Sequence, residues 1–388
     1  LPKAKAVLKA LLQNPPKDMT QVASELQPAL RYREQLLAST ANEFNAMVKA
    51  LDGGTIYPAP GGDPVLNPNV LPTGRNMYSI NAEMAPNQRA WEDGKRLAEA
   101  TIKQYVTKHG DYPRKVSYTF WAGEFITTEG ATLAQAFWML GIEPVRDNQG
   151  RVVDLKRIPS QELGRPRINV VVQVSGQLRD IAGSCLKLLT DAVRLASESQ
   201  DEVYPNYVAS GTLLQERTLM DKGVAPKEAR RMSTMRVFGP VNSGYSTGIM
   251  SYTENSGSWD DEKEIAEGFL NNMGATYGDD ENWGNFQKDL FASALTETDV
   301  VIQPRQSNTW GPISLDHVYE FTGGLSLTVK TITGKEPDAY MADYRNRNNR
   351  RLQEAKDAIS VETRATILNP TFIKERMKGG AGTAQMFG

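Results

Sequence analysis

Residues 168–174, with the sequence INVVVQV, form the apolar run that decides the fold. The run has the length of one strand, and its near-continuous apolar character is typical of a strand in a sheet that is covered on both faces. A strand pattern at 115–121 and a helix pattern at 133–140 precede it, and a helix pattern at 185–196 follows it. This order of strand, helix, strand and helix predicts a parallel, right-handed α/β unit over residues 115–200.

The composition changes on both sides of this unit. Residues 55–77 are too rich in Pro and Gly for a helix or a central strand, but their apolar side chains favour an ordered loop over a flexible linker. The chain starts at Leu1 rather than Met and stops at Gly388 just after a helical pattern, so we expect a fragment of a larger multidomain protein with an α/β fold and helical flanks. The predicted segments are a helical part at 1–54, a loop plus helix at 55–114, the α/β unit at 115–200, and a mixed α/β and helical part at 201–388. The remaining patterns predict helices at 90–108, 213–236, 261–272, 286–295, 316–333 and 346–368, and short strands at 152–155 and 299–302.

The composition excludes several classes of function. Lys and Arg number 44 against 46 acids, which gives a net charge of -2 and no basic field for nucleic acid or a membrane surface. No apolar run of 18 residues occurs, so this fragment has no predicted membrane span. The single cysteine, Cys185, lies in an apolar helical pattern and is interpreted as a buried thiol in a reducing, cytoplasmic compartment. This interpretation does not exclude a membrane contact through segments outside this chain.

The chain also lacks the residues for some common active sites. Only two histidines and one cysteine occur, so a His/Cys zinc site cannot be assembled. Gly334-Lys335 is followed by Glu336, so no phosphate-binding P-loop is present and the segment should not hydrolyse nucleotide itself.

Residues 236–264 have the composition of a loop-built surface rather than of a core. Small polar residues and turn formers dominate, and Tyr245, Tyr252 and Trp259 are costly to expose without a purpose. Within this segment, Glu254 is surrounded by Asn, Ser, Gly and Trp. In a pocket without a charge partner, we expect this carboxyl to have a raised pKa and to exchange protons near neutrality.

Two further polar stretches, 121–124 and 175–180, follow the predicted strands, where ligands of parallel sheets bind. Glu124 belongs to the first stretch, and His317 lies near a Gly pair farther along. Forked hydrogen bonds from Arg75, Arg179 and Arg236 could bind ligand carboxylates. These residues fit two classes of protein: one that clamps a large flat ligand, and a glycan-processing enzyme with paired acids over an aromatic platform.

Six motifs in order resemble the large subunits of the cobalt chelatase (CobN type) and magnesium chelatase (H subunit) family. They cover nearly the whole chain from about residue 51 to the end, and this order has no reason to exist in a glycan-processing enzyme. The motifs are GGDPVLNPNVLPTGRN (61–76), WAGEFITTEG (121–130) followed by LAQAFWMLGIEPV, ELGRPRINVVVQVSGQLRD (162–180), RVFGP…GYSTG…ENSGSW (236–259), YEFTGG (319–324) and ILNPTFI (367–373).

The resemblance implies a tetrapyrrole metal chelatase of the ligase class, as in cobalamin biosynthesis. In such a protein the large subunit holds a porphyrin, haem or hydrogenobyrinate-type corrin and a divalent metal (Co, Mg or Fe), while AAA+ ATPase subunits hydrolyse ATP with Mg, beside an integrin-like subunit. Removing the ring N–H protons needs a carboxylate or imidazole, for which Glu254, Glu124 and His317 are the candidates. The candidate tetrapyrrole-binding residues are Arg75, Trp121, Arg179, Arg236, Tyr245, Ser246, Asn255 and Trp259, and no metal ligand is assigned.

Three departures from the family pattern bear on the direction of the reaction. CobN-type sequences usually have FHGG where this chain has Phe321-Thr322-Gly323-Gly324, and the family often has His about where Gly211 stands. The acid that follows the Gly in the family is Ala131 here, with Glu129 two residues earlier. Metal insertion remains the first interpretation because it is the common activity of the family that the chain resembles, while the departures favour iron removal. The alternatives are a dechelatase that takes iron out of haem, which needs proton donors to the ring, and a non-catalytic haem or corrinoid binder.

Overall fold

The computed structural model describes residues 2–16, 24, 26–61, 64, 68–78, 81–200, 202–241, 244–307, 311–313 and 316–380. The chain forms two compact units, Leu1–Ser79 and Ile80–Gly388. Part of the predicted ordered loop at 55–77 lies outside the described residues.

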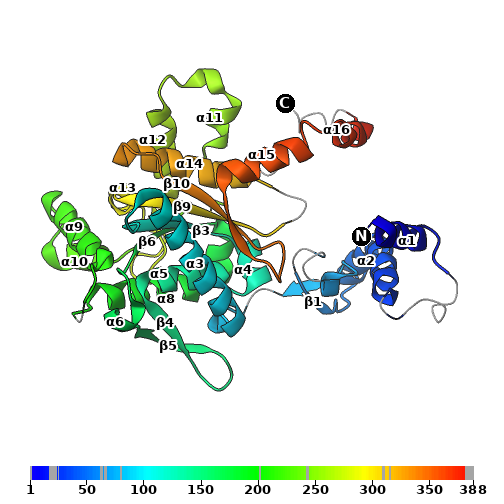
Figure 1. Ribbon diagram of the computed structural model, residues 1–388, viewed down its shortest axis with the longest axis horizontal. Helices are drawn as coiled ribbons and strands as arrows, with labels where there is room; N and C mark the ends of the chain where they lie inside the picture. The colour runs from blue at the N-terminus through cyan, green and yellow to red at the C-terminus, as the bar shows by residue number, and fades with distance from the viewer. Residues whose placement is uncertain are drawn as a thin grey trace. The chain divides into compact units, whose positions relative to one another are not determined.

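A seven-stranded, mostly parallel sheet organises the larger unit (Figure 1). Its order is β11-β10-β9-β3-β6-β7-β8, and only the two edge strands, β11 and β8, run antiparallel to their neighbours. The strands are β3 (Lys115–Phe120), β6 (Asn169–Val174), β7 (Val237–Gly239), β8 (Ala275–Thr276), β9 (Thr298–Arg305), β10 (Asp338–Asp343) and β11 (Arg351–Glu354). The predicted α/β fold is confirmed, and the sheet draws strands from both sides of residue 200.

Helices cover both faces of the sheet, which explains why the central strands β3 and β6 are buried at every residue (Figure 1). On one face, Val116, Val170 and Val300 pack with residues of α3, α5 and α8. On the other face, Val171, Phe238 and Val301 pack with residues of α12, α13 and α14. The helices of this unit are α3 (Gln88–His109), α4 (Ala122–Thr128), α5 (Ala131–Leu140), α6 (Ser160–Leu163), α7 (Gly176–Ile181), α8 (Gly183–Ser197), α9 (Tyr207–Asp221), α10 (Pro226–Met232), α11 (Met250–Glu254), α12 (Glu262–Met273), α13 (Lys288–Leu295), α14 (Asp316–Thr333), α15 (Ala355–Ala365) and α16 (Pro370–Arg376), with short 3₁₀ turns η3 (Ala82–Met84), η4 (Ser256–Ser258) and η5 (Met377–Gly379).

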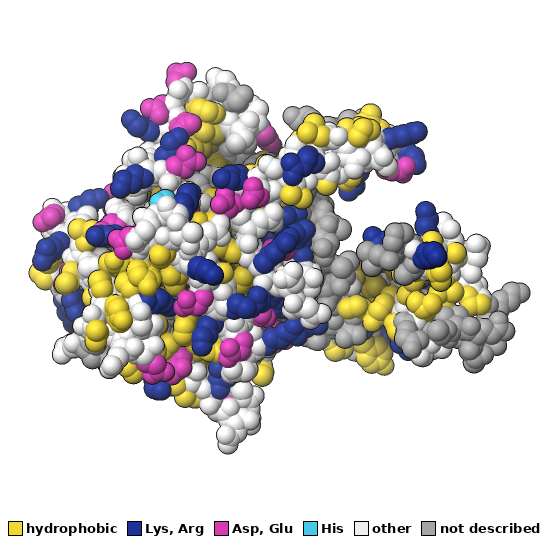
Figure 2. Space-filling model, viewed as in Figure 1, with side chains coloured by type: hydrophobic (Ala, Val, Ile, Leu, Met, Phe, Trp, Pro, Cys, Tyr) yellow, Lys and Arg dark blue, Asp and Glu magenta, His cyan; other side chains and the backbone are white. Residues whose placement is uncertain are grey.

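The smaller unit contains α1 (Pro2–Gln13), α2 (Gln27–Leu51), the 3₁₀ turn η2 (Pro68–Val70), and two short parallel strands, β1 (Pro58–Pro60) and β2 (Asn76–Tyr78). Its hydrophobic side chains gather on the surface (Figure 2), because Leu37, Phe44 and Leu51 of α2 are 65%, 63% and 85% exposed. On the face of the larger unit shown in Figure 2, basic and acidic side chains are interspersed.

Four predicted elements differ from the structure. The helix predicted at 213–236 is divided into α9 and α10, with no helix at 222–225 or after Met232. The strand predicted at 152–155 is β5 (Val152–Arg157), which pairs with β4 (Ile142–Arg146) in a separate hairpin and not in the central sheet. The start of the helix predicted at 346–368 is wrong, because residues 351–354 form edge strand β11. The loop-built stretch from 236 also begins with a buried strand, β7, so its first residues belong to the core. Among the described residues, no helix is long and apolar enough to cross a membrane.

Candidate functional site

The polar residues predicted at the strand ends meet the N-terminal half of α14. Strands β6, β3, β9 and β10 are parallel, so their carboxyl ends share one edge of the sheet. At this edge, the indole of Trp121 packs edge-on against Phe321 of α14, with ring centres 5.3 Å apart. One residue earlier on the helix, Glu320 is fully buried. This edge of the sheet is the candidate site.

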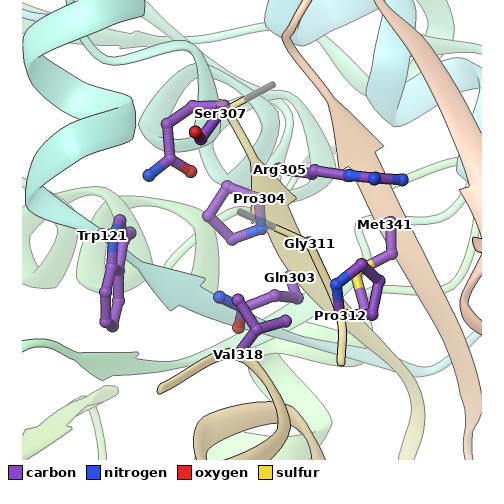
Figure 3. Close-up of a pocket in the computed structure, with 10 residues that line it drawn as sticks. Trp121, Gln303, Pro304, Arg305, Ser307, Gly311, Pro312, Val318 and Met341 are labelled. Carbon is purple, nitrogen blue, oxygen red and sulfur yellow. The ribbon is translucent and has the colours of Figure 1, made fainter. Parts of the chain in front are cut away.

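A narrow pocket opens beside Trp121 (Figure 3). In the close-up, Trp121 lies on one side of β9, while Arg305 extends on the other side toward Met341 of β10. The enclosed volume is about 10 Å³, which is the space of about one water molecule, so a macrocycle does not fit inside the pocket. Its lining consists of Trp121, Gln303, Pro304, Arg305, Gln306, Ser307, Gly311, Pro312, Val318 and Met341.

Glu320 holds the loop that carries Tyr245 and Ser246. One of its carboxylate oxygens accepts hydrogen bonds from the Thr247 backbone N–H at 2.7 Å, from the Thr247 hydroxyl at 2.6 Å and from the Ser246 hydroxyl. Because Glu320 is 0% exposed, this contact joins residues 244–248 firmly to α14. The sequence pointed to Ser246 but not to Glu320, although the YEFTGG motif contains it.

The same loop contacts α7 on its other side. The Tyr245 hydroxyl donates to the Asp180 carboxylate at 3.2 Å. Close packing continues at Gly176, where an added Cβ would lie 2.4 Å from the Gly244 carbonyl oxygen, so only glycine is accommodated. The Tyr245 side chain itself is 55% exposed and is available to a ligand.

The Arg179 side chain is buried beneath this edge of the sheet and does not project into solvent. Its Nε pairs with Asp180 at 2.8 Å, and its guanidinium lies 5.3 Å from the ring centre of Tyr277. The predicted fork toward a ligand carboxylate is therefore already engaged with protein groups.

A buried polar row lies under α14. Gln173 donates from its amide nitrogen to the Thr119 hydroxyl at 2.6 Å and to the Phe321 carbonyl at 3.1 Å. Its amide oxygen, the amide oxygen of Gln303 and the hydroxyl of Thr322 have no hydrogen-bond partner among the described residues, although all three atoms are buried. Buried polar atoms without a protein partner usually bond to a water molecule or to a ligand group at the site. Thr322 stands where CobN-type sequences usually have His.

Glu124 lies on the opposite face of the sheet from the pocket. Its carboxylate accepts from the Thr128 hydroxyl at 2.5 Å and from the Thr132 backbone at 3.1 Å, while Oε2 has no partner in the part of the chain that the structure describes. Burial raises the pKa of Glu124 to about 7, against the smaller opposing effect of these hydrogen bonds. The group therefore has a pKa suited to proton transfer, but it is 0% exposed within a core that also contains Tyr344.

Arg236 lies at the opposite edge of the sheet, away from the pocket, and its role in ligand binding stays a prediction. It is 0% exposed and donates to Asn169 at 3.2 Å, to Gln215 at 2.7 Å and to backbone carbonyls. Burial lowers the pKa of this guanidinium to about 9. Gly211 adjoins the same network, because an added Cβ would lie 2.3 Å from Asn169 Nδ2, and a His at 211 would not fit.

Three further predicted residues of the larger unit, Glu254, Asn255 and Trp259, do not line the pocket. Glu254 and Asn255 are exposed at the end of α11, which projects beyond α12 in Figure 1, so Glu254 lacks the enclosing pocket predicted for it. Trp259 is half-buried and donates to the Tyr252 carbonyl at 2.9 Å. His317 belongs to α14, but its side chain lies outside the described residues. Arg75 belongs to the smaller unit, where it donates to the carbonyls of Pro72 and Leu71 at 3.0 and 3.1 Å.

A sequence profile of the CobN/Magnesium Chelatase family matches residues 3–388. The chain belongs to the CobN/magnesium chelatase family. The aerobic cobaltochelatase subunit CobN of Sinorhizobium sp is 30% identical over 352 residues, which are 90% of this chain and 27% of that protein. The H subunit of magnesium chelatase from Rhodobacter capsulatus is 31% identical over 353 residues, which are 90% of this chain and 28% of that protein.

The fold also resembles a solved member of the family. The catalytic subunit of cobaltochelatase from Mycobacterium tuberculosis matches with a TM-score of 0.83 and 30% identity, over 94% of this chain and 31% of that chain. This member of the CobN/magnesium chelatase family therefore spans between a quarter and a third of the length of these relatives. Among the described residues, no group of three His, Cys, Asp or Glu side chains is arranged to hold a metal ion.

Proposed function

We propose that this chain is part of the large subunit of a tetrapyrrole metal chelatase. In this proposal it binds a porphyrin or corrin ring and takes part in inserting a divalent metal, while separate subunits hydrolyse ATP. The observation that carries the proposal is the family match over residues 3–388, because relatives in it are named as cobalt and magnesium chelatases. The arrangement at the carboxyl edge of the sheet supports it, since aromatic side chains and buried polar orphans gather there.

We assign different roles in ligand binding to the residues at this edge of the sheet. Tyr245 and Trp121 offer ring faces to a flat ligand, and Glu320 keeps the Tyr245 loop in place. Residues of the projecting segment, Glu254 and Asn255 with Trp259, remain proposed contacts that would meet the ring from outside. Glu254→Gln tests the proton-carrying role of that segment: a loss of turnover supports the role, and unchanged turnover contradicts it.

Iron removal from haem is the second candidate, and Thr322 favours it. An imidazole at this position could hold a divalent metal before insertion, whereas a neutral hydroxyl is a weak ligand for such an ion. The Thr322 hydroxyl is buried at this position and no described residue bonds it.

Titration of the full-length protein with metal-free porphyrin, corrin and haem tests the proposal. A shift of the tetrapyrrole absorption band that saturates at micromolar concentration is expected, and unchanged spectra with every tetrapyrrole would refute tetrapyrrole binding. Each complex is then incubated with metal salt, partner subunits and ATP, and the haem complex is also incubated with a reductant. The absorption spectrum of the product shows whether metal was inserted or removed. Binding without turnover in either direction would favour a non-catalytic binder.

A further inference from the structure

We propose that an exposed apolar stripe on α2 docks an amphipathic helix from the part of the full-length subunit that lies outside residues 1–388. The stripe consists of Leu37, Ala41, Phe44, Val48 and Leu51. The inference rests on the proposed function in one respect only, because it treats this chain as part of a larger subunit. It adds an interaction surface within that subunit and the kind of segment that this surface fits.

The residues of the stripe follow one face of α2. They are separated along the chain by four, three, four and three residues, which is the heptad spacing of a helix that packs lengthwise against another helix. Leu37, Phe44 and Leu51 are the strongly exposed residues noted above, and Val48 is 49% exposed. Figure 2 shows hydrophobic side chains gathered on the surface of this unit. A contiguous exposed apolar surface of this kind marks an interaction site.

The smaller unit uses the opposite face of α2 for its own packing. The Thr73 backbone N–H donates to the Ser39 hydroxyl at 3.1 Å, and the Asn42 amide donates to the Thr73 carbonyl. An added Cβ at Gly74 would lie 2.5 Å from a backbone atom of α2, so this loop lies directly against the helix. At 3.6 residues per turn, Ser39 and Asn42 lie on the side of the helix opposite Phe44.

This orientation of α2 is the reverse of the usual one. An amphipathic helix normally turns its apolar face to the core and its polar face to water. In the part of the smaller unit that the structure describes, the polar face of α2 is packed and the apolar stripe remains exposed. The stripe therefore has the character of a surface that another segment covers.

The positions beside the stripe favour packing within a larger fold over a coiled coil between two copies of this chain. In two-stranded coiled coils, the positions that flank the seam are often Glu and Lys. Between residues 37 and 51, the flanking positions are Ala38, Thr40, Asn45 and Met47, and none of them is charged. Met47 is also 56% exposed, which widens the apolar face on one side. An uncharged border of this kind suits a contact that excludes water along its whole width.

The length of the relatives supplies the source of the docking helix. The family match begins at residue 3, so α2 belongs to the matched region. The solved cobaltochelatase subunit matches 94% of this chain, but the match covers only 31% of that subunit. A large subunit of such a length has most of its polypeptide outside residues 1–388, and the docking helix is assigned to that part. Apolar side chains at the same spacing on the incoming helix would interdigitate with the stripe.

Photocrosslinking in the full-length subunit tests the source of the helix. The photoreactive amino acid p-benzoylphenylalanine replaces Phe44, and mass spectrometry identifies the peptide to which it becomes linked. A mixture of isotopically light and heavy protein separates links within one chain from links between copies. The expected result is a link within one chain to a peptide outside residues 1–388. A link to residues 80–388, or a link between two copies, would overturn the assignment.

Cysteine labelling tests independently whether the stripe is covered. Val48→Cys lies on the stripe, whereas Ala50→Cys is the matched control, because Ala50 is exposed on the same helix and points away from the stripe. In the native full-length subunit, a maleimide should label Val48→Cys at least about tenfold more slowly than Ala50→Cys, and in urea the two rates should be equal. Peptide mapping separates both sites from the buried Cys185.

Equal labelling rates in the native subunit would show that the stripe stays open to solvent, and the inference would be wrong. Neither experiment involves a tetrapyrrole, so the proposed function is tested separately by the binding spectra. If the spectra stay unchanged with every tetrapyrrole while the stripe is protected and linked as expected, tetrapyrrole binding fails and the docking surface stands.

Discussion

The buried carboxyl of Glu124 makes a contribution to the stability of the protein that depends on pH. The folded state holds its proton with a pKa of about 7, against an ordinary value of 4.5. Between these values the unfolded chain releases the proton and the folded protein keeps it, so rising pH lowers the free energy of unfolding. Above pH 7 the cost is constant at about 3 kcal/mol.

Glu124→Gln removes this titration. From pH 5.5 to pH 8 the wild type should lose about 2 kcal/mol of stability relative to the variant, which urea unfolding at the two pH values measures. An equal response of the two proteins to pH would contradict the raised pKa.

Glu320 gives a second prediction for one residue. Glu320→Ala leaves the donors of Ser246 and Thr247 without their acceptor, so the backbone amides of residues 244–248 should exchange hydrogen at least about tenfold faster. Hydrogen–deuterium exchange with mass spectrometry measures this. Glu336→Ala changes an exposed acid elsewhere and should leave these amides as they are. Protection that survives in Glu320→Ala would show that other contacts hold the loop.

At this level the sequence identified kinds of residue better than their surroundings. It predicted an enclosing pocket for Glu254, because polar residues surround it in the chain, but the structure leaves Glu254 exposed and buries Glu124. Burial depends on packing between distant segments, which local composition does not encode. Arg236 illustrates the same point, because its partners Asn169 and Gln215 are far from it in sequence.

Helix α14 gives a matched pair of glycines for a test of one element. An added Cβ at Gly324 would lie 2.7 Å from Phe269 and 2.8 Å from Ile249, whereas at Gly323 nothing lies within 4 Å. Gly324→Ala should therefore cost about 1–3 kcal/mol through overpacking, and it should weaken tetrapyrrole binding as α14 moves away from α12. Gly323→Ala should add up to about 1 kcal/mol through helix propensity. Thermal unfolding of both variants checks the contrast, and equal effects would contradict the packing.

The elements were predictable where the apolar pattern is long and regular. Strands β3 and β6 and helices α5, α8, α12 and α14 lie close to where the sequence placed them. Short edge strands such as β8 and β11 were missed, because two to four residues carry too little pattern and pairing with a neighbour decides their conformation. The sequence also did not predict that β5 lies outside the central sheet, because its pairing with β4 depends on the tertiary structure and not on the local pattern.

At the level of the whole molecule, the parallel sheet brings polar loops from three separate parts of the chain to one edge. The family explains why these loops occur in this order, and the structure adds the contacts that join them: Glu320 to residues 246 and 247, Asp180 to Tyr245, and Trp121 to Phe321. The segment spans only part of the length of its relatives.

A structure of the full-length subunit with a bound tetrapyrrole would show where the ring lies. We expect the macrocycle against the N-terminal half of α14, in contact with Tyr245. A ring bound away from the carboxyl ends of β3, β6 and β9, with no contact to α14 or to the Tyr245 loop, would contradict the proposed site.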